Sequence, residues 1–173
     1  MKRSALGIAV LLTLSGILSW GEQVVAAAQM EGAKLSVADP EKPAAEWLTD
    51  YEAALKKARE LNRPILLDFT GSDWCGWCIK LKKEVFDTPE FKKYASENLI
   101  LVELDFPMRK PQPPALKSQN RKLQAQFGIQ GYPTIVLLDA TGKEIGRTGY
   151  RPGGGASYVK HLQEILSKTT PNK

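Results

Sequence analysis

Residues 65–78 have the sequence ILLDFTGSDWCGWC, which joins a short apolar run to the only two cysteines of the chain. Ile65 to Phe69, bounded by Pro64 and Gly71, is typical of a buried strand. A helix is expected at or just after Cys75, which places this cysteine at a helix N-terminus. Two thiols at this spacing can form a disulfide and reopen, whereas a disulfide that stabilises a fold usually joins distant segments. The stretch therefore predicts a redox-active pair.

Cys75 is the expected nucleophile of the pair. Unpaired N–H groups and the helix dipole favour an anion at a helix N-terminus, and the thiolate is the reactive form of cysteine. Lys80, Lys82 and Lys83 follow one to two turns later and add a weak positive potential if exposed. Cys78 is expected to be more buried and placed to attack the mixed disulfide that Cys75 forms.

Other uses of a Cys-x-x-Cys motif fit less well. Covalent haem attachment needs a histidine next, but Ile79 stands there. A closed zinc site needs about four ligands, and the chain offers two cysteines and the distant His161. A metal shared between two chains and an inert local disulfide remain alternatives, and thiol–disulfide exchange is favoured.

The N-terminus has the features of an export signal. Lys2 and Arg3 precede an apolar run from Ala5 to Leu18, the length of a signal-peptide core. Cleavage is expected after Ala28, with Gly21 as the alternative, and an uncleaved membrane anchor is a further possibility. We expect a signal peptide at 1–28, a flexible lead-in at 29–43, one folded domain at 44–168 and a tail at 169–173. Export to an oxidising compartment, a bacterial periplasm, follows.

Composition excludes several classes of partner. The chain is 43% hydrophobic and 25% charged, as in globular proteins, with a net charge of +5. Its lysines lie in helical stretches without interleaved aromatic residues, so nucleic acid is not an expected partner. Residues 153–155 are glycines but lack the lysine of a phosphate-binding loop. We expect a monomer with no organic cofactor and no bound metal, in which the cysteines carry the electrons.

Periodicity predicts an α/β protein. The apolar positions 47, 48, 51, 54, 55, 58 and 61 recur at helical spacing, which predicts one helix ended by residues 62–64. Further strands are expected at 99–104, 134–138 and 144–148, and helical segments at 79–86, from Thr88, at 118–127 and around 159–166. Residues 106–116, with four prolines, are expected to be irregular, and 153–155 to form a loose link. The order predicts a mixed sheet with parallel strands and a final antiparallel hairpin, covered by helices on both faces.

Three motifs together resemble the thioredoxin family. They are ILLDF at 65–69, WCGWC at 74–78 and GYPT at 131–134, and the resemblance extends from Trp47 to Leu166. The approach from Gly71 to Cys75 is more similar to exported thioredoxin-like proteins and to the C-terminal domain of the interchange protein DsbD. The resemblance implies a thioredoxin-like fold and a protein-disulfide oxidoreductase whose redox-active disulfide joins Cys75 and Cys78.

The resemblance also implies roles for neighbouring residues. Pro133 matches the family's cis-proline, which lets the preceding backbone bond an extended substrate; an ordinary trans bond is the alternative. Asp68 matches a buried acid that moves a proton to or from Cys78, and burial would raise its pKa. Its alternative is an exposed aspartate at a strand end. The residues expected to line the substrate site are Trp74, Gly76, Trp77, Tyr132 and Pro133.

The chain departs from the family pattern at three places. One additional residue separates Asp68 from Cys75. Glu103 stands where the family carries a lysine, which would bring two acids together and raise the pKa of one; a solvated strand residue is the alternative. The proline-rich segment 106–116 is an insertion that either shapes partner choice or is a tolerated surface excursion.

The direction of electron flow depends on the residues between the cysteines. Strong oxidants and isomerases of the family usually carry a histidine beside the second cysteine, and this chain has Trp77. We therefore favour a reductase or electron carrier that exchanges with protein disulfides or dithiols and is supplied by a membrane electron donor. The alternatives are an oxidant or isomerase, and a non-catalytic protein whose thiols hold a partner or Cu(I).

Overall fold

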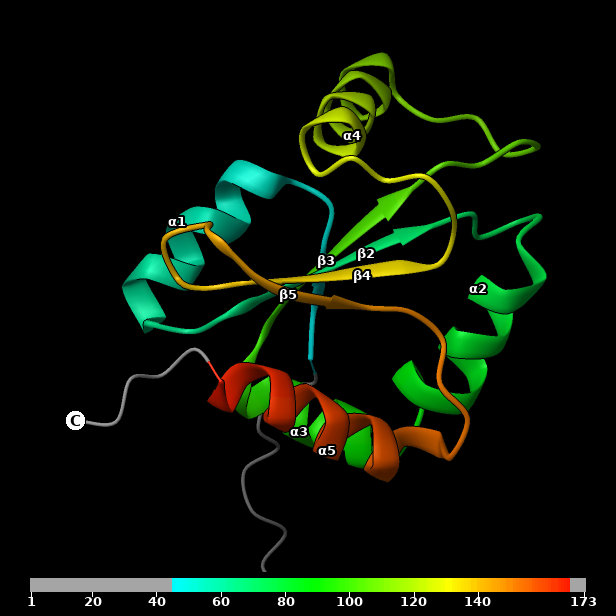
Figure 1. Ribbon diagram of the computed structural model, residues 1–173. Helices are drawn as coiled ribbons and strands as arrows, with labels where there is room; N and C mark the ends of the chain where they lie inside the picture. Colours follow the sequence, from blue (N-terminus) through cyan, green and yellow to red (C-terminus); the bar gives the residue numbers. More distant parts are fainter. Residues whose placement is uncertain (1–44, 169–173) are drawn as a thin grey trace, which may run out of the picture. The chain divides into compact units, whose positions relative to one another are not determined.

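The computed structural model describes residues 45–168. The predicted signal peptide, lead-in and C-terminal tail lie outside the described residues. The elements in chain order are β1 (Trp47–Leu48), α1 (Tyr51–Leu61), β2 (Ile65–Thr70), α2 (Gly76–Leu81), the π-helical turn η1 (Lys82–Phe86), α3 (Pro89–Asn98), β3 (Ile100–Asp105), α4 (Pro114–Gln126), β4 (Thr134–Leu138), β5 (Glu144–Thr148) and α5 (Gly154–Ser167) (Figure 1).

These strands form one mixed sheet in the order β1-β3-β2-β4-β5. β2 pairs parallel with β3 and antiparallel with β4, and β5 pairs antiparallel with β4. All six residues of the central strand β2 are buried, as expected where both faces of a sheet are covered. The predicted mixed sheet with a final antiparallel hairpin is confirmed.

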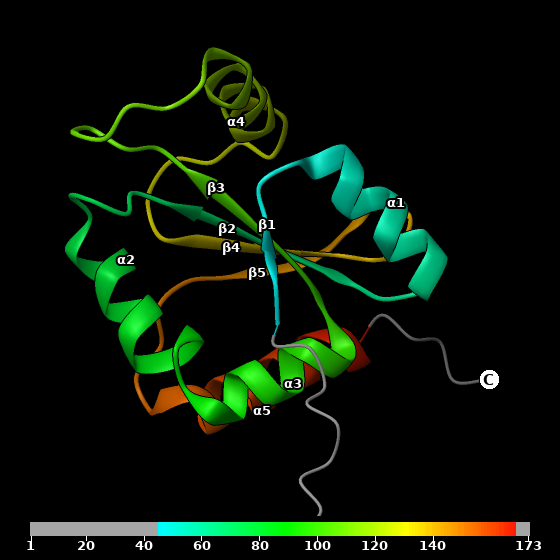
Figure 2. The ribbon, with the colours of Figure 1, turned by 180° about the vertical axis from the view of Figure 1, so that it is seen from behind.

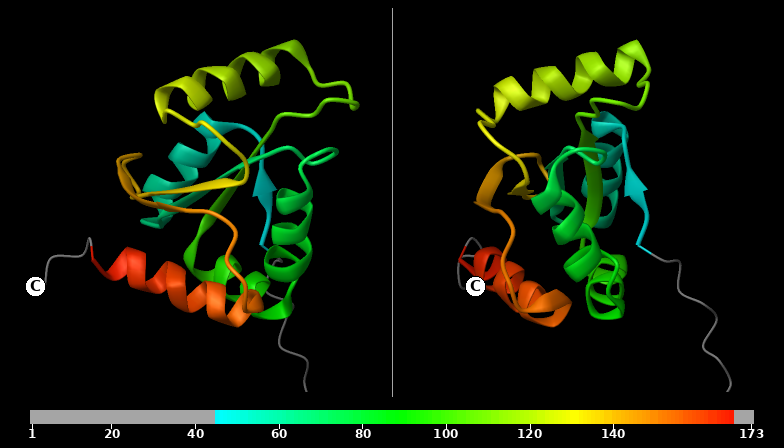
Figure 3. Two further views of the ribbon diagram at one scale, coloured as in Figure 1. Left: turned by 45° about the vertical axis from the view of Figure 1, so that its right-hand side comes forward. Right: turned by 90° about the vertical axis from the view of Figure 1, so that its right-hand side faces the viewer.

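Helices cover both faces of the sheet. Figure 2 shows the strands from behind, and Figure 3 shows α4 on one side of the sheet, with α3 and α5 on the other. Leu67 and Phe69 of β2 pack toward α1 and α4, whereas Leu66 packs toward η1, α3 and α5. Because side chains alternate along a strand, Asp68 shares the face of Leu66. The fold thus directs this acid toward the helix that carries the cysteines.

Local capping explains where two of the helices begin. Asp50 accepts a hydrogen bond from the backbone N–H of Ala53 (3.0 Å) and so caps α1. Thr88 caps α3, and Pro89 is its first helical residue, as the sequence predicts. No helix within residues 45–168 is long and apolar enough to cross a bilayer.

The predicted start of the first helix is wrong. Trp47 and Leu48 form the edge strand β1, which pairs parallel with β3, and the helix begins at Tyr51. Their spacing matches a helix only by coincidence. Trp47 instead packs its ring 5.1 Å from the ring of Phe86, on the face opposite α1.

Two further helices begin earlier than predicted. α4 starts at Pro114 and not Ser118, so the last residues of the proline-rich segment are helical; proline is tolerated in a first turn because its missing N–H has no helical partner. α5 starts at Gly154, so the glycine run is a helix start and not a loose link. Gly153 and Gly154 have φ of 111° and 74°, which side chains disfavour.

Candidate active site

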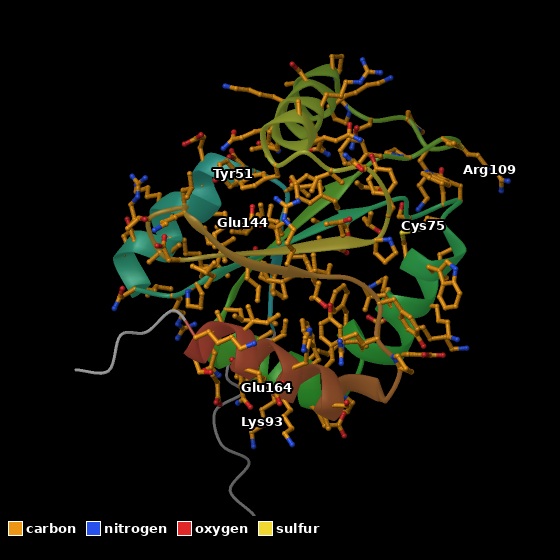
Figure 4. The ribbon with its side chains drawn as sticks, viewed as in Figure 1. Tyr51, Cys75, Lys93, Arg109, Glu144 and Glu164 are labelled. Carbon is orange, nitrogen blue, oxygen red and sulfur yellow. A yellow bond between two sulfur atoms is a disulfide. The ribbon has the colours of Figure 1, made fainter. Side chains whose placement is uncertain are left out.

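Cys75 and Cys78 form a disulfide, with sulfur atoms 2.08 Å apart, where the loop after β2 enters α2 (Figure 4). Cys75 is the N-cap residue of α2, and the backbone N–H of Cys78 donates to its sulfur at 3.2 Å. This donor would stabilise a thiolate at Cys75 once the pair is reduced. Both cysteines are buried, with 7% and 4% of their surface exposed, so the predicted difference in burial is small.

The loop between β2 and Cys75 folds tightly over Gly71. A Cβ atom at Gly71 would lie 2.5 Å from Cε2 of Trp74, so only glycine leaves room for this indole ring. The ring nitrogen of Trp74 donates to the backbone oxygen of Phe106 at 2.8 Å. The backbone N–H of Cys75 donates to the Gly71 oxygen at 2.9 Å, which fixes the approach to the disulfide.

Two polar side chains before the cysteines hold the end of β3 and the segment beyond it. Asp105 accepts hydrogen bonds from the backbone N–H (2.8 Å) and the hydroxyl (2.6 Å) of Ser72. Asp73 accepts from three successive backbone N–H groups, those of Met108, Arg109 and Lys110, at 2.7–3.0 Å. Sequence reasoning missed Asp73, since its partners lie 35 to 37 residues away.

Asp68 is a buried acid beneath the cysteine helix, as predicted. Its side chain is 6% exposed, and its Oδ1 atom has no hydrogen-bond partner within the described chain. Burial raises the pKa of Asp68 well above its usual range, and the carboxylates of Glu103 and Asp105 raise it further. The Lys82 ammonium opposes this shift.

Glu103 lies directly beside Asp68, so the two acids are adjacent, and Glu103 is not a fully solvated strand residue. The register of β2 and β3 pairs the two residues. Burial raises the pKa of Glu103, and the Asp105 charge adds to the shift. Both carboxyls line a cavity of about 120 Å³ together with Cys78 and Lys82. The cavity therefore links the second cysteine to two groups that can hold a proton.

The proline loop lies beside the disulfide loop. The Tyr132–Pro133 peptide bond is cis, as the resemblance predicts. Thr134, the next residue, begins β4 opposite Phe69 of β2. The Tyr132 ring lies 5.8 Å from the Trp74 ring at nearly a right angle, so the two aromatic residues meet between the loops.

Trp77 lies on the exposed side of the pair. Its ring is 5.2 Å from that of Tyr150, and the Lys80 ammonium lies over both rings at 5.1 and 5.2 Å. Gly76 is exposed, with open space where a Cβ would stand. Lys82 lies 3.0 Å from the Asp87 carboxylate, and Lys83 is exposed.

His161 is not part of this site. It lies on α5, where its ring nitrogen is 2.9 Å from the Thr148 hydroxyl. Among residues 45–168, no group of three or more histidine, cysteine, aspartate or glutamate side chains gathers as metal ligands.

A family model described as a thioredoxin-like domain matches residues 51–161. The chain belongs to the thioredoxin-like family. It is 43% identical over 116 residues to the disulfide bond reductase DsbH of Chlamydia pneumoniae, covering 67% of this chain and 70% of that protein. A solved structure of a DsbH oxidoreductase is 39% identical with a TM-score of 0.70, and the match covers 79% of this chain and 95% of that one.

The similarity to DsbD is also confirmed. The thiol:disulfide interchange protein DsbD of Yersinia enterocolitica is 27% identical over 121 residues, which are 68% of this chain and 19% of that protein. The thioredoxin-like chain therefore corresponds to one part of DsbD. It is a thiol–disulfide oxidoreductase of the DsbH and DsbD type and carries the Cys75–Cys78 pair.

Proposed function

We propose that this protein is an exported reductase of protein disulfides, active in a bacterial periplasm. The observation that carries the proposal is the position of Cys75, whose sulfur accepts the Cys78 backbone N–H at the start of α2. A donor there favours the attacking thiolate. The similarity to a protein named disulfide bond reductase supports electron flow from this protein to its substrate. Lys2 and Arg3 before an apolar run support export.

The reaction uses the reduced pair and moves two electrons to the substrate. The Cys75 thiolate attacks one sulfur of a substrate disulfide, that S–S bond breaks, and the other substrate sulfur leaves as a thiolate that takes up a proton. Cys78 then loses its proton and attacks the Cys75 sulfur. The mixed disulfide breaks, the Cys75–Cys78 disulfide forms, and the second substrate thiol is released. A dithiol donor, which we place in the membrane, reduces the pair again.

We assign to Asp68 the role of accepting the proton from the Cys78 thiol and returning it. Both line the same cavity, and the raised pKa of Asp68 suits a group that takes and returns a proton. We assign Trp74, Gly76, Trp77, Tyr132 and Pro133 to the substrate site, because they surround the disulfide or belong to the loops beside it.

A trapping experiment tests the exchange reaction. The variant Cys78→Ala, reduced and mixed with a disulfide-containing protein, should accumulate a mixed disulfide through Cys75 that mass spectrometry resolves. The matched variant Cys75→Ala should form none. If Cys78→Ala forms no adduct with any protein disulfide, the exchange proposal is wrong and a role in holding a partner or Cu(I) gains support.

Equilibration with glutathione tests the direction. We expect a reduction potential near the value of about −270 mV that is typical of thioredoxin, and far from the value of about −120 mV that is typical of a strong oxidant. A measured potential near −120 mV would show that the protein oxidises its partners instead.

A further inference from the structure

Large apolar side chains are exposed around the disulfide. Residues 45–168 contain five such side chains, and four belong to the segments beside the pair: Trp74, Trp77, Ile79 and Met108. Trp77 is 59% exposed and Met108 is 72% exposed. Exposed apolar residues scattered singly need no explanation, but a group of them marks an interaction site.

Met108 reaches this group because its segment is fixed to the disulfide loop. Residues 106–113, here called the Met108 loop, are held by the Trp74 ring nitrogen at the Phe106 oxygen and by Asp73 at three backbone N–H groups. At the far end of the loop, Gln112 donates to the backbone oxygen of Asp105 at 3.0 Å. These hydrogen bonds therefore hold the Met108 loop beside the segment that leads into Cys75.

The Met108 loop adds positive charge to this face. Arg109 and Lys110 are exposed in the Met108 loop, and Arg109 projects from the same side of the molecule as Cys75 (Figure 4). Lys80 lies on the other side of the pair, over Trp77. Two acids also lie nearby: Asp73, which accepts the loop's N–H groups, and Glu84, which lies 3.9 Å from the Lys80 ammonium and accepts from the Tyr150 hydroxyl at 2.6 Å. Because Lys80 is paired with Glu84, Arg109 and Lys110 supply the positive charge that is available to a partner.

We propose that the Met108 loop and Trp77 form the two walls of a docking surface for an extended, acidic protein segment that carries a large apolar side chain beside its disulfide. Resting on the proposed reductase function, the assignment names the substrate class. The flexible thioether of Met108 adapts to apolar side chains of different shape. Arg109 and Lys110 attract the acidic residues and raise the rate of encounter.

Matched peptides test both parts of the proposal. Each peptide carries one internal disulfide: the first has leucine and two glutamates beside it, the second replaces the glutamates with lysines, and the third replaces the leucine with serine. Prereduced protein is mixed with each in single turnover, and the second-order rate constants are compared. We expect the wild type to prefer the first peptide over both others.

Two variants assign the preferences to residues. Arg109→Ser should reduce the ratio of rates for the acidic and basic peptides by up to about fivefold. Met108→Ser should reduce the ratio for the leucine and serine peptides. Lys92→Ser, which removes an exposed cation on α3, should change neither ratio. Met108, Arg109 and Lys92 are all exposed, so the three variants should keep the fold.

Unchanged ratios in Arg109→Ser and Met108→Ser would overturn the docking proposal. A preference of the wild type for the basic peptide would also overturn it. The neutral small substrate 2-hydroxyethyl disulfide separates this result from failure of the reductase function: a wild-type protein that reduces it but shows no peptide preference lacks only the docking surface. A protein that fails to reduce it lacks the proposed chemistry.

Discussion

Asp68 and Glu103 place two carboxyl groups side by side under the redox pair. Ionisation of one disfavours ionisation of the other, and burial disfavours both. Asp105 and Tyr158 also couple to Asp68, and Lys82 is the cation that opposes them. The charge of Glu103 therefore adds to the effect of burial on the pKa of Asp68, and both residues line the cavity that also reaches Cys78.

The buried Asp68 should lower stability at neutral pH. A folded-state pKa above the unfolded value means that the folded state binds the proton more tightly, so stability falls as pH rises from the unfolded pKa through the folded one. Asp68→Asn should raise the free energy of unfolding by roughly 1–3 kcal/mol at pH 8 and less at pH 4. Urea unfolding at both pH values measures this. An equal effect at both would contradict the raised pKa.

Replacing Glu103 should shift the titration of its neighbour. In Glu103→Gln the negative charge beside Asp68 is lost, so the pKa of Asp68 should fall, though burial keeps it above the ordinary value. NMR titration of a selectively labelled Asp68 carboxyl carbon measures the shift. Glu60→Gln, on an exposed face of α1, is the control and should leave the curve unchanged. A rise in the pKa would contradict the proposed pairing.

Individual site residues were predictable to different degrees. The cysteines were predicted from their spacing, and Asp68 and Pro133 were predicted from the resemblance to the thioredoxin family, because all four lie in local motifs. Glu103 required an alignment across strands, which only the β2–β3 register fixes. The contact between Asp73 and the Met108 loop was not predicted. Asp73 binds three backbone N–H groups of this loop, and every residue except proline has such a group, so the sequence does not indicate which ones Asp73 binds.

At the scale of elements, α5 depends on a close approach to α3. A Cβ at Gly155 would overlap the hydroxyl of Thr88, the residue that caps α3. Gly155→Ala should therefore lower the free energy of unfolding by about 1–3 kcal/mol, measured by denaturant titration. Gly131→Ala, where open space surrounds the new methyl group and φ is ordinary, is the matched control. Similar losses in both would rule out the steric cause.

Elements with strong local signals were predicted, and those defined by distant partners were not. β2 and β4 were recognised as apolar runs between turn residues, and α3 by its Thr88–Pro89 start. β1 has two residues, and its hydrogen bonds come from β3, about fifty positions later in the chain. Periodicity therefore assigned it to a helix that begins only after Asp50.

At the scale of the whole described chain, the site lies where several elements end together. β2 ends at Thr70 and β3 at Asp105, and the Phe106 N–H donates to the Thr70 oxygen at 2.9 Å. β4 begins opposite the end of β2. Apolar clusters on both faces of the sheet support these ends. The redox pair thus lies at the end of the sheet where β2 and β3 end and β4 begins.

Export is testable with the full chain. Expressed in a Gram-negative bacterium, the protein should appear in the periplasmic fraction with Gln29 as its first residue, because cleavage is expected after Ala28. N-terminal sequencing measures this, and a start at Glu22 would indicate cleavage after Gly21. Changing Lys2 and Arg3 together to glutamate should slow export. Intact protein in the cytoplasmic fraction would contradict the proposed location.

The edges of the sheet have a consequence for behaviour in concentrated solution. Among the described residues, β1 provides a two-residue edge, and the opposite edge strand β5 is paired irregularly near Leu138 and carries the charged pair Glu144 and Arg147. Short, irregular and charged edges give a second copy little backbone on which to add a strand. The protein should therefore resist aggregation through the edges of its sheet.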